Sequence, residues 1–401
     1  MTRLRLDALR ALEPLAALGR TPRPHFSFGG DSMLGFYFHV PFCHGKCPYC
    51  DFYSLPDSQE NMDAYVQAVL TSLAPWRDKL RNRELATVYF GGGTPSLLGA
   101  ARLGALLQGV KEGFSLSPTA EITLEANPTH VDLSFFQGVR EAGFNRLSMG
   151  LQSADPAQLR LLGRAHSPQD AALAVENART AGFTNISLDL MLGLPGGSWE
   201  TLKGSIAFAA GLGVEHISSY IFKVEPGTPF AARGVQLPDD EETSQQYLLL
   251  VEELGKLGYA QYEISNFARP GRESRHNLLY WRGEEYLGFG PGAHSFFGGR
   301  RFYYPRDLEG FLQGNTPVDD GPGGDFGEFA MLNLRLTRGL RRQDCLARFG
   351  LAGASLFEEV LKNARRCPPQ LLRQEEGCLS FTPEGFLVSN ALLVRLLGEE
   401  L

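Results

Sequence analysis

Short apolar runs alternate with longer amphipathic segments through the first two thirds of the chain. The runs are rich in aromatic and β-branched side chains, so they predict strands. They lie at 35–40, 87–90, 121–126, 145–150, 185–190 and 216–220. The intervening segments repeat apolar residues at helical spacing and lie at 62–80, 103–112, 133–142, 169–181 and 199–212. This order is typical of a parallel sheet whose strands are joined by crossover helices.

Six such strands are too many for one mononucleotide-binding half and too few for a closed eight-stranded barrel. We therefore expect an α/β fold, a partial (β/α)6 barrel that stays open. Later segments predict a helix at 239–257 and a short strand at 262–265, and helical patterns dominate from residue 326. We expect an N-terminal extension over 1–34, the barrel over 35–300, and a smaller, mainly helical C-terminal domain over 301–401.

Composition and charge narrow the class of protein. The 401 residues are 43% hydrophobic and 21% charged, as in soluble globular proteins, and the net charge of −7 argues against nucleic acid as a partner. No run of roughly 18 apolar residues predicts a transmembrane helix. The first 20 residues lack the apolar core of a secretory signal, and Asp7 and Glu13 argue against an organelle-targeting helix. We expect a cytoplasmic protein, with peripheral contact at the inner face of the membrane as an option.

Three of the six cysteines lie close together, directly after the first predicted strand. Cys43, Cys47 and Cys50 have C-x3-C-x2-C spacing. Thiolates are soft ligands that suit iron–sulfur clusters, zinc or copper(I). Three cysteines on one loop can hold three corners of a cubane cluster and leave the fourth iron open to a small molecule. A zinc site completed by His39 or His44 is the alternative, although zinc sites usually space cysteines as C-x2-C pairs.

These cysteines and several further motifs resemble the radical SAM superfamily. The motifs also resemble the family of oxygen-independent coproporphyrinogen III oxidases and their relatives, from about residue 35 to the C-terminus. They lie at 37–43, 47–52, 91–96, 121–128, 148–153, 162–166 and 188–196. The resemblance implies a [4Fe–4S] cluster on the three cysteines and S-adenosylmethionine (SAM) as its ligand. The cofactor would then supply the radical chemistry, and the protein would position it.

The resemblance also implies a set of SAM-binding residues. In chain order they are Tyr37, Tyr49, Gly92, Gly93, Thr94, Glu125, Gln152, Arg164 and Asp189. Glu125, Gln152 and Asp189 come at or just beyond the ends of predicted strands, where polar residues of (β/α) barrels converge on a site. Gln152, Arg164 and Asp189 match positions that bind a second SAM in the oxidases. A structural salt bridge between Asp189 and Arg164 is the alternative.

Two features distinguish branches of this family. The oxidase branch, to which the motifs are similar, has the pattern C-x3-C-x2-C-x-C, with a fourth cysteine two residues after the third. In this chain that position is Phe52. The second feature is an HNxxYW motif at 276–281, which resembles the heme-chaperone branch and implies heme contacts from His276, Tyr280 and Trp281. Flat aromatic side chains stack on flat macrocycles. The alternative is that these residues anchor the loop on the barrel. His294 is a second ligand candidate, and Ser274 stands where relatives often carry a cysteine.

Three functions follow from these observations. The first is a heme chaperone that delivers heme to respiratory hemoproteins. The second is an oxygen-independent coproporphyrinogen III oxidase, and the third is a radical SAM enzyme acting on an unrelated substrate. Phe52 and the HNxxYW motif favour the first. Reduction of the cluster would need a flavodoxin or ferredoxin-type partner, and both a monomer and a homodimer are compatible with the sequence.

Overall fold

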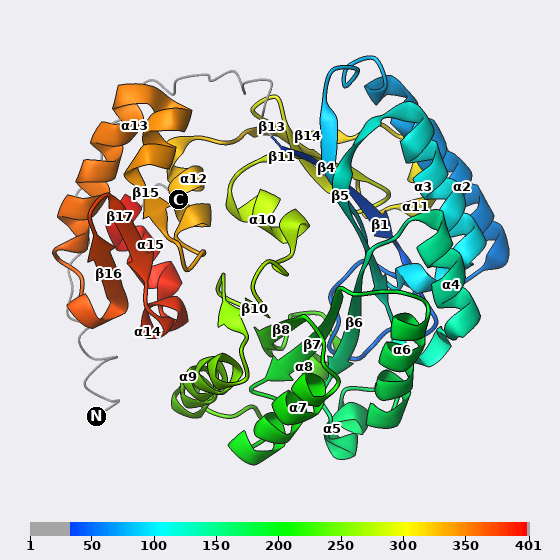
Figure 1. The fold of residues 1–401 in the computed structure, drawn as a ribbon, viewed down its shortest axis with the longest axis horizontal. Coiled ribbons are helices and arrows are strands. Elements are labelled where there is room, and N and C mark those ends of the chain that lie inside the picture. Colours follow the sequence, from blue (N-terminus) through cyan, green and yellow to red (C-terminus); the bar gives the residue numbers. More distant parts are fainter. Residues whose placement is uncertain (1–32, 399–401) are drawn as a thin grey trace.

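A parallel sheet forms the centre of the molecule. A computed structural model describes residues 33–398, so nearly all of the expected extension over 1–34 lies outside the described part. Six strands pair in parallel, in the order β1-β4-β5-β6-β7-β8. They are β1 Leu34–Val40, β4 Glu84–Gly92, β5 Ser115–Ala126, β6 Arg146–Gln152, β7 Ile186–Leu192 and β8 His216–Ile221. Every strand predicted in this region is therefore present, and the curved sheet is open on one side (Figure 1).

Further strands extend the sheet at both edges to twelve. Beside β1 they are β11 Glu285–Phe289, β12 His294–Phe297, β13 Arg300–Tyr303 and β14 Val318–Pro322; beside β8 they are β10 Asn266–Ala268 and β9 Ala260–Gln261. The sheet thus continues past residue 300. The strand predicted at 262–265 is wrong, because these residues form the turn between β9 and β10. Within that turn, Glu263 makes an isolated bridge to Leu336.

Amphipathic helices cover the outer face of the sheet (Figure 1). They are α2 Gln59–Leu73, α3 Gly99–Gly113, α4 Leu133–Ala142, α5 Pro156–Leu161, α6 Pro168–Thr180 and α7 Trp199–Gly211. Local capping explains where several begin. Asp132 accepts a hydrogen bond from the amide of Phe135 at 2.8 Å, and Ser198 accepts one from Thr201 at 3.3 Å. Predicted and observed helices agree to within a few residues, except that α2 ends at Leu73 rather than residue 80.

Side chains along each central strand alternate between an apolar outer layer and a polar inner layer, as the pleat of a strand requires. The outer layer packs under the helices and includes Phe36, Phe38, Val88, Phe90, Ile122, Leu124, Leu147, Met149, Leu188 and Leu190. The inner layer includes Tyr37, His39, Thr87, Tyr89, Glu121, Glu125, Arg146, Ser148, Ser187, Asp189 and His216. The interior of the barrel is therefore a hydrogen-bonded polar layer, and most of the apolar packing lies outside it.

Helix α10, Arg275–Trp281, lies on the inner face of the sheet, near the centre of Figure 1. The Glu121 carboxylate accepts hydrogen bonds from the amides of Arg275 and His276, at 3.2 and 3.1 Å. A negative charge at a helix N-terminus is stabilising. Ser274, which is fully buried, caps the same turn by accepting a hydrogen bond from the amide of Asn277. Helix α10 thereby fills the end of the barrel where the strands begin.

The C-terminal part of the chain forms a small domain on the open side of the barrel (Figure 1). Its elements are α12 Phe326–Asn333, β15 Leu340–Arg341, α13 Arg342–Ala364, β16 Leu372–Glu375, β17 Cys378–Phe381, α14 Pro383–Leu387 and α15 Ser389–Leu397. The amide of Ile264 donates to the carbonyl of Arg335 at 3.0 Å, which ties this domain to the barrel. Helices α8 Pro229–Arg233, α9 Asp240–Lys256 and α11 Leu308–Leu312 lie in connections. Within residues 33–398, no helix is both long and apolar enough to cross a membrane.

The position of α10 can be tested by removing its buried anchor. Leu279 is fully buried and packs where Gly35 lacks a side chain; a Cβ there would lie 2.5 Å from Leu279 Cδ1. We expect Leu279→Ala to lower the free energy of unfolding by about 2–5 kcal/mol, because the site cannot collapse. Leu351, 82% exposed on α13, is the control. Leu351→Ala should change the free energy of unfolding by less than about 0.5 kcal/mol. Equal losses in denaturant unfolding would contradict this placement of α10.

Candidate functional site

A short loop carries the three clustered cysteines. It begins at β2, Phe42–Cys43, and returns at β3, Leu55–Pro56, which pairs with β2 in parallel. All three thiols are free and partly exposed. The Sγ atom of Cys43 lies 3.5 Å from Thr94 Oγ1, and that of Cys47 lies 3.8 Å from a guanidinium nitrogen of Arg164. The guanidinium would stabilise a thiolate at Cys47, the form in which cysteine binds metals.

The donor set fits a cluster better than a single ion. Among residues 33–398, no three His, Cys, Asp or Glu side chains surround one ion position. His39 uses both ring nitrogens, with the Tyr37 hydroxyl and the Tyr53 carbonyl each at 3.1 Å, so it is not free to complete a zinc site. In a cubane cluster each cysteine binds a different iron, so the thiols do not have to converge. Soft thiolates also match iron–sulfur clusters.

The glycine-rich loop after β4 packs against the base of the cysteine loop. The amide of Gly93 donates to the Val40 carbonyl at 2.8 Å, and that of Thr94 donates to the Phe42 carbonyl at 2.7 Å. A Cβ on Gly93 would lie 2.6 Å from the Phe42 oxygen, and Gly92 has a φ of +114°. Close backbone packing therefore accounts for glycine at both positions. It also places Gly92 beside Glu125, whose carboxylate accepts from the Gly92 amide at 3.2 Å.

Two partly buried carboxyl groups face the barrel interior, Glu125 near the end of β5 and Asp189 in the middle of β7. Glu125 accepts a hydrogen bond from the Tyr89 hydroxyl at 2.7 Å, and burial raises its pKa to about 7. Burial also raises the pKa of Asp189, which accepts from the Ser148 hydroxyl at 3.3 Å. Asp189 does not pair with Arg164, which donates to the Gly150 carbonyl at 2.9 Å. Within the described chain neither carboxyl group has a cationic side chain in ion-pair contact, so a cationic ligand such as SAM fits here.

Gln152 and Arg164 show a second sign of a ligand site. Gln152 has a φ of +66°, and it is the only residue other than glycine with a positive φ within residues 33–398. Such a conformation costs of the order of 1 kcal/mol or more and concentrates at functional sites. Its Oε1 atom and Arg164 Nε are both buried, and neither has a hydrogen-bond partner in the described chain. Buried polar atoms are normally satisfied, so a polar ligand fits between β6 and the cysteine loop.

The HNxxYW residues occupy different surroundings. His276 is buried, and both of its ring nitrogens are hydrogen-bonded, Nδ1 with the Thr87 hydroxyl at 2.7 Å and Nε2 with the Tyr280 hydroxyl at 2.8 Å. Burial lowers the pKa of His276 to about 3, so the ring is neutral. Tyr280 reaches a cavity, whereas Trp281 does not line it. In this arrangement His276 positions Tyr280 through the hydrogen bond to its hydroxyl group.

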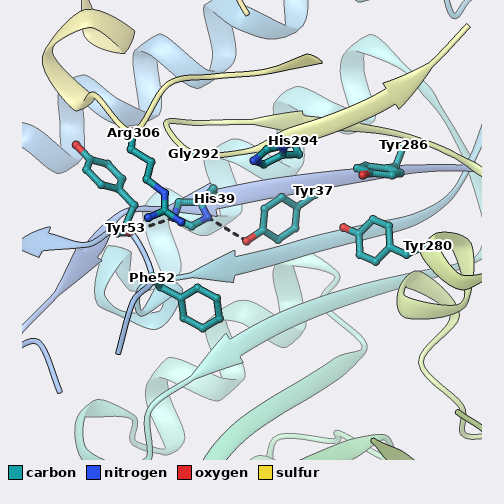
Figure 2. A pocket seen from close by; sticks show the side chains of 9 residues that line it. All are labelled: Tyr37, His39, Phe52, Tyr53, Tyr280, Tyr286, Gly292, His294 and Arg306. Atoms are coloured by element: carbon teal, nitrogen blue, oxygen red, sulfur yellow. Dashed lines mark hydrogen bonds between the residues drawn. The ribbon is translucent and has the colours of Figure 1, made fainter. Parts of the chain in front are cut away.

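That cavity lies inside the barrel beside the cysteine loop and has a volume of about 320 Å³. Figure 2 shows its nine lining residues, which come from six parts of the chain: Tyr37, His39, Phe52, Tyr53, Tyr280, Tyr286, Gly292, His294 and Arg306. Phe52 is 64% exposed, and Arg306 lies 3.7 Å from Asp51. Aromatic walls with a few polar groups are typical of sites for flat organic ligands.

Sequence reasoning identified Tyr37, Phe52, Tyr280 and His294 but missed other lining residues. Tyr286 lies on β11, in a run that was not assigned to a strand. A strand at 285–289 with alternating exposure would have indicated that Tyr286 faces inward. His39 was considered only as a zinc ligand. Arg306 lies in a connection before α11, and no local pattern points to it.

Comparison with known proteins identifies the family. Residues 37–209 match the radical SAM superfamily, and residues 327–388 match the HemN C-terminal domain. Proteins named heme chaperone HemW are 39% identical to this chain in Mycobacterium tuberculosis and 38% identical in Escherichia coli. The matches cover 96% and 91% of this chain, and 98% of each relative. The chain belongs to the HemW family of radical SAM proteins. This confirms the resemblance carried by the three cysteines, Phe52 and the HNxxYW motif.

The fold of this HemW family member is also that of a solved enzyme. Coproporphyrinogen III oxidase of Escherichia coli, HemN, matches with a TM-score of 0.79 over 99% of this chain and 93% of its own, at 23% identity. That likeness confirms the α/β radical SAM fold. Membership of the radical SAM superfamily implies a [4Fe–4S] cluster and SAM. The free thiols, the unpaired carboxyl groups and the unsatisfied atoms of Gln152 and Arg164 fit both.

The raised pKa of Glu125 predicts that this side chain lowers the free energy of unfolding, and by more at high pH than at low pH. The folded protein holds this proton up to about pH 7 and the unfolded chain only to about 4.5, so the cost grows as pH rises through that window. We expect apoprotein carrying Glu125→Gln to be more stable than wild type by about 3 kcal/mol at pH 8, falling below about 1 kcal/mol at pH 5.

Glu263 provides a matched comparison, because burial raises its pKa to about 7 too, and it lies in the turn between β9 and β10, where it forms a bridge to Leu336. Glu263→Gln should show the same pH dependence in denaturant unfolding. A gain in stability that is equal at pH 5 and pH 8 would show that Glu125 titrates normally.

Proposed function

We propose that this chain is a heme chaperone that holds a [4Fe–4S] cluster and SAM, binds heme, and delivers it to respiratory hemoproteins. Relatives named heme chaperone HemW match it over nearly their whole length, including one from Bacillus subtilis at 34% identity. The observation that carries the proposal is the aromatic cavity beside the cysteine loop, with Phe52 at its edge. A tetrapyrrole presents the flat apolar faces and carboxylates that such a lining suits.

In this proposal Cys43, Cys47 and Cys50 hold three irons of the cluster. Bound there, the cluster supplies one electron at a time, which a flavodoxin or ferredoxin-type protein would provide. Arg164 lies close to Cys47 and balances part of the negative charge that three thiolates add. Thr94 is in hydrogen-bond reach of Cys43, and hydrogen bonds to cluster sulfurs tune reduction potential.

SAM would occupy the polar interior between the cysteine loop and strands β5, β6 and β7. Its positive charges would face Glu125 and Asp189, whose burial without a cation is otherwise unfavourable. Gln152 and Arg164 would supply the hydrogen bonds that their buried atoms lack. Tyr37 of β1 and Tyr49 of the cysteine loop would contact SAM from its two sides; Tyr49 packs edge-on against Phe222 and Phe230, with ring centroids 5.9 and 6.3 Å away.

Heme would lie on the other side of Tyr37, in the aromatic cavity. The chaperone would act in the cytoplasm and meet membrane-bound acceptors at the inner face of the membrane. His276 would hold Tyr280 in place against the ligand, and Trp281 would support α10 from behind. Because the cavity is open to solvent, heme could leave it without a rearrangement of the barrel.

A coproporphyrinogen III oxidase is the second candidate, and the common fold with HemN favours it. Fold alone is a weak argument for activity. Phe52 occupies the position of the fourth cysteine in the pattern of the oxidase branch. Its side chain lines one side of the cavity. The chaperone therefore explains more of the site.

The two candidates give different products in one anaerobic experiment. Protein with reconstituted cluster is incubated with SAM, dithionite and either heme or coproporphyrinogen III. We expect stable heme binding by visible absorption and no protoporphyrinogen by chromatography. Cys43→Ala should lose the cluster absorption, while Cys345→Ala, a buried cysteine of the C-terminal domain, should keep it. Protoporphyrinogen formed over many turnovers would establish the oxidase instead.

The SAM site has its own test. Glu125→Gln should weaken SAM binding by roughly tenfold or more, equivalent to about 1.4 kcal/mol, because a buried partner of a positive charge is lost. Glu263→Gln has the same chemistry and a similar pKa and should bind SAM as wild type does. Equilibrium dialysis with labelled SAM measures both. Equal affinities would exclude Glu125 as a SAM contact.

A further inference from the structure

The histidines of the described chain differ in whether their ring nitrogens are in use. His39 and His276 are hydrogen-bonded through both nitrogens, and His216 likewise uses both, with Ser187 and Tyr262. A histidine binds iron through an unprotonated nitrogen that has no other partner. His294 makes no side-chain hydrogen bond to any residue within 33–398, and its ring is exposed to the cavity.

We propose that His294 is the side chain that binds heme iron, a residue outside the HNxxYW motif. This inference rests on the proposed chaperone function and assigns the ligand within it. His276 would have to give up two hydrogen bonds and leave a buried position before it could reach iron. His294 needs no such change, because it already lines the cavity on β12.

The surroundings hold the His294 ring in place. It stacks on Tyr303 of β13, with ring centroids 5.2 Å apart and planes 23° apart. Its strand pairs with β13 directly at this point, His294 opposite Tyr303. In the view of Figure 2 the ring lies between Arg306 and Tyr286, above Tyr37. A ligand fixed by a neighbouring aromatic loses little conformational entropy when it binds metal.

The rest of the lining matches the porphyrin that such an iron would carry. Tyr286 and Phe52 present aromatic faces to the cavity. Arg306 is 61% exposed and pairs with Asp51, itself 57% exposed, at 3.7 Å. An exposed pair of this kind contributes little, so Arg306 can exchange Asp51 for a propionate carboxylate. Arginine suits carboxylates because its guanidinium donates two parallel hydrogen bonds.

The size of the cavity adds a point about release. A volume of about 320 Å³ takes the edge of a porphyrin and leaves the rest of the macrocycle outside. Heme held by one histidine and partly exposed can be passed to an acceptor that offers its own ligand to the free face. A single exposed ligand therefore suits a protein that transfers heme.

The test uses the full chain with its cluster reconstituted, titrated with hemin and followed by Soret absorption and electron paramagnetic resonance. We expect His294→Ala to lose the histidine-ligated iron signal and to bind hemin about tenfold more weakly or worse. Added imidazole should restore the signal. His130→Ala removes an exposed histidine that does not line the cavity, and it should behave as wild type.

A second variant covers the case in which His294→Ala fails to fold. His294→Met keeps a side chain of similar length and replaces nitrogen by sulfur, so it should shift the iron signal rather than abolish binding. An unchanged signal in either variant, with wild type binding hemin, would overturn this inference and leave the chaperone standing. Failure of wild type itself to bind hemin would overturn the proposed function.

Discussion

The contacts of the Glu121 carboxylate fix the arrangement of side chains inside this barrel. It accepts from the first two amides of α10 and faces Arg146, whose guanidinium nitrogen lies 4.0 Å away. Both side chains are buried, so the pair persists only because its geometry is completed by the helix. With α10 fixed, His276 reaches Thr87 and Tyr280 reaches the cavity. The site near the cysteine loop thus depends on a charge pair at the opposite end of the strands.

Much of the fold was predictable because its information is local. The six central strands combine aromatic and β-branched residues, and cap residues such as Asp132 and Ser198 mark where helices begin. The course of β11 to β14 was not predictable, since the residues of Glu285–Phe289 pair with β1 residues 251 positions earlier in the chain, and the pattern of this strand is short. The strand predicted at 262–265 failed for the converse reason. Its backbone pairs with the C-terminal domain instead of the sheet, since the Ile264 amide donates to the Arg335 carbonyl and Glu263 forms a bridge to Leu336.

The cluster cysteines were predictable from spacing alone, and the cavity was not. Its residues come from β1, the cysteine loop, α10, β11, β12 with the turn before it, and the connection before α11, which meet only in the folded chain. His276 also shows what the sequence does not reveal. A motif identified it as a functional residue, but only its two hydrogen bonds reveal that the ring is occupied. Sequence can name a chemical group, whereas availability is a property of its neighbours.

The interior also shows how the protein accommodates many ionisable side chains at low solvent exposure. Tyrosine hydroxyls, neutral histidines and carboxyl groups with raised pKa values can all stay uncharged, which avoids the cost of burying ions. A ligand that brings positive charge therefore changes the protonation of the residues around it.

The stack formed by Tyr37, Tyr89 and His276 has a consequence for how this sequence can vary. The rings lie 5.0–6.3 Å apart and come from β1, β4 and α10, and each also makes a hydrogen bond to another part of the interior. Contacting residues of this kind show non-additive energies. A substitution at one ring changes which side chains fit at the other two positions. We therefore expect substitutions at these three positions to occur together, each compensating for another. The barrel lining should evolve in blocks, while the exposed helices outside it drift residue by residue.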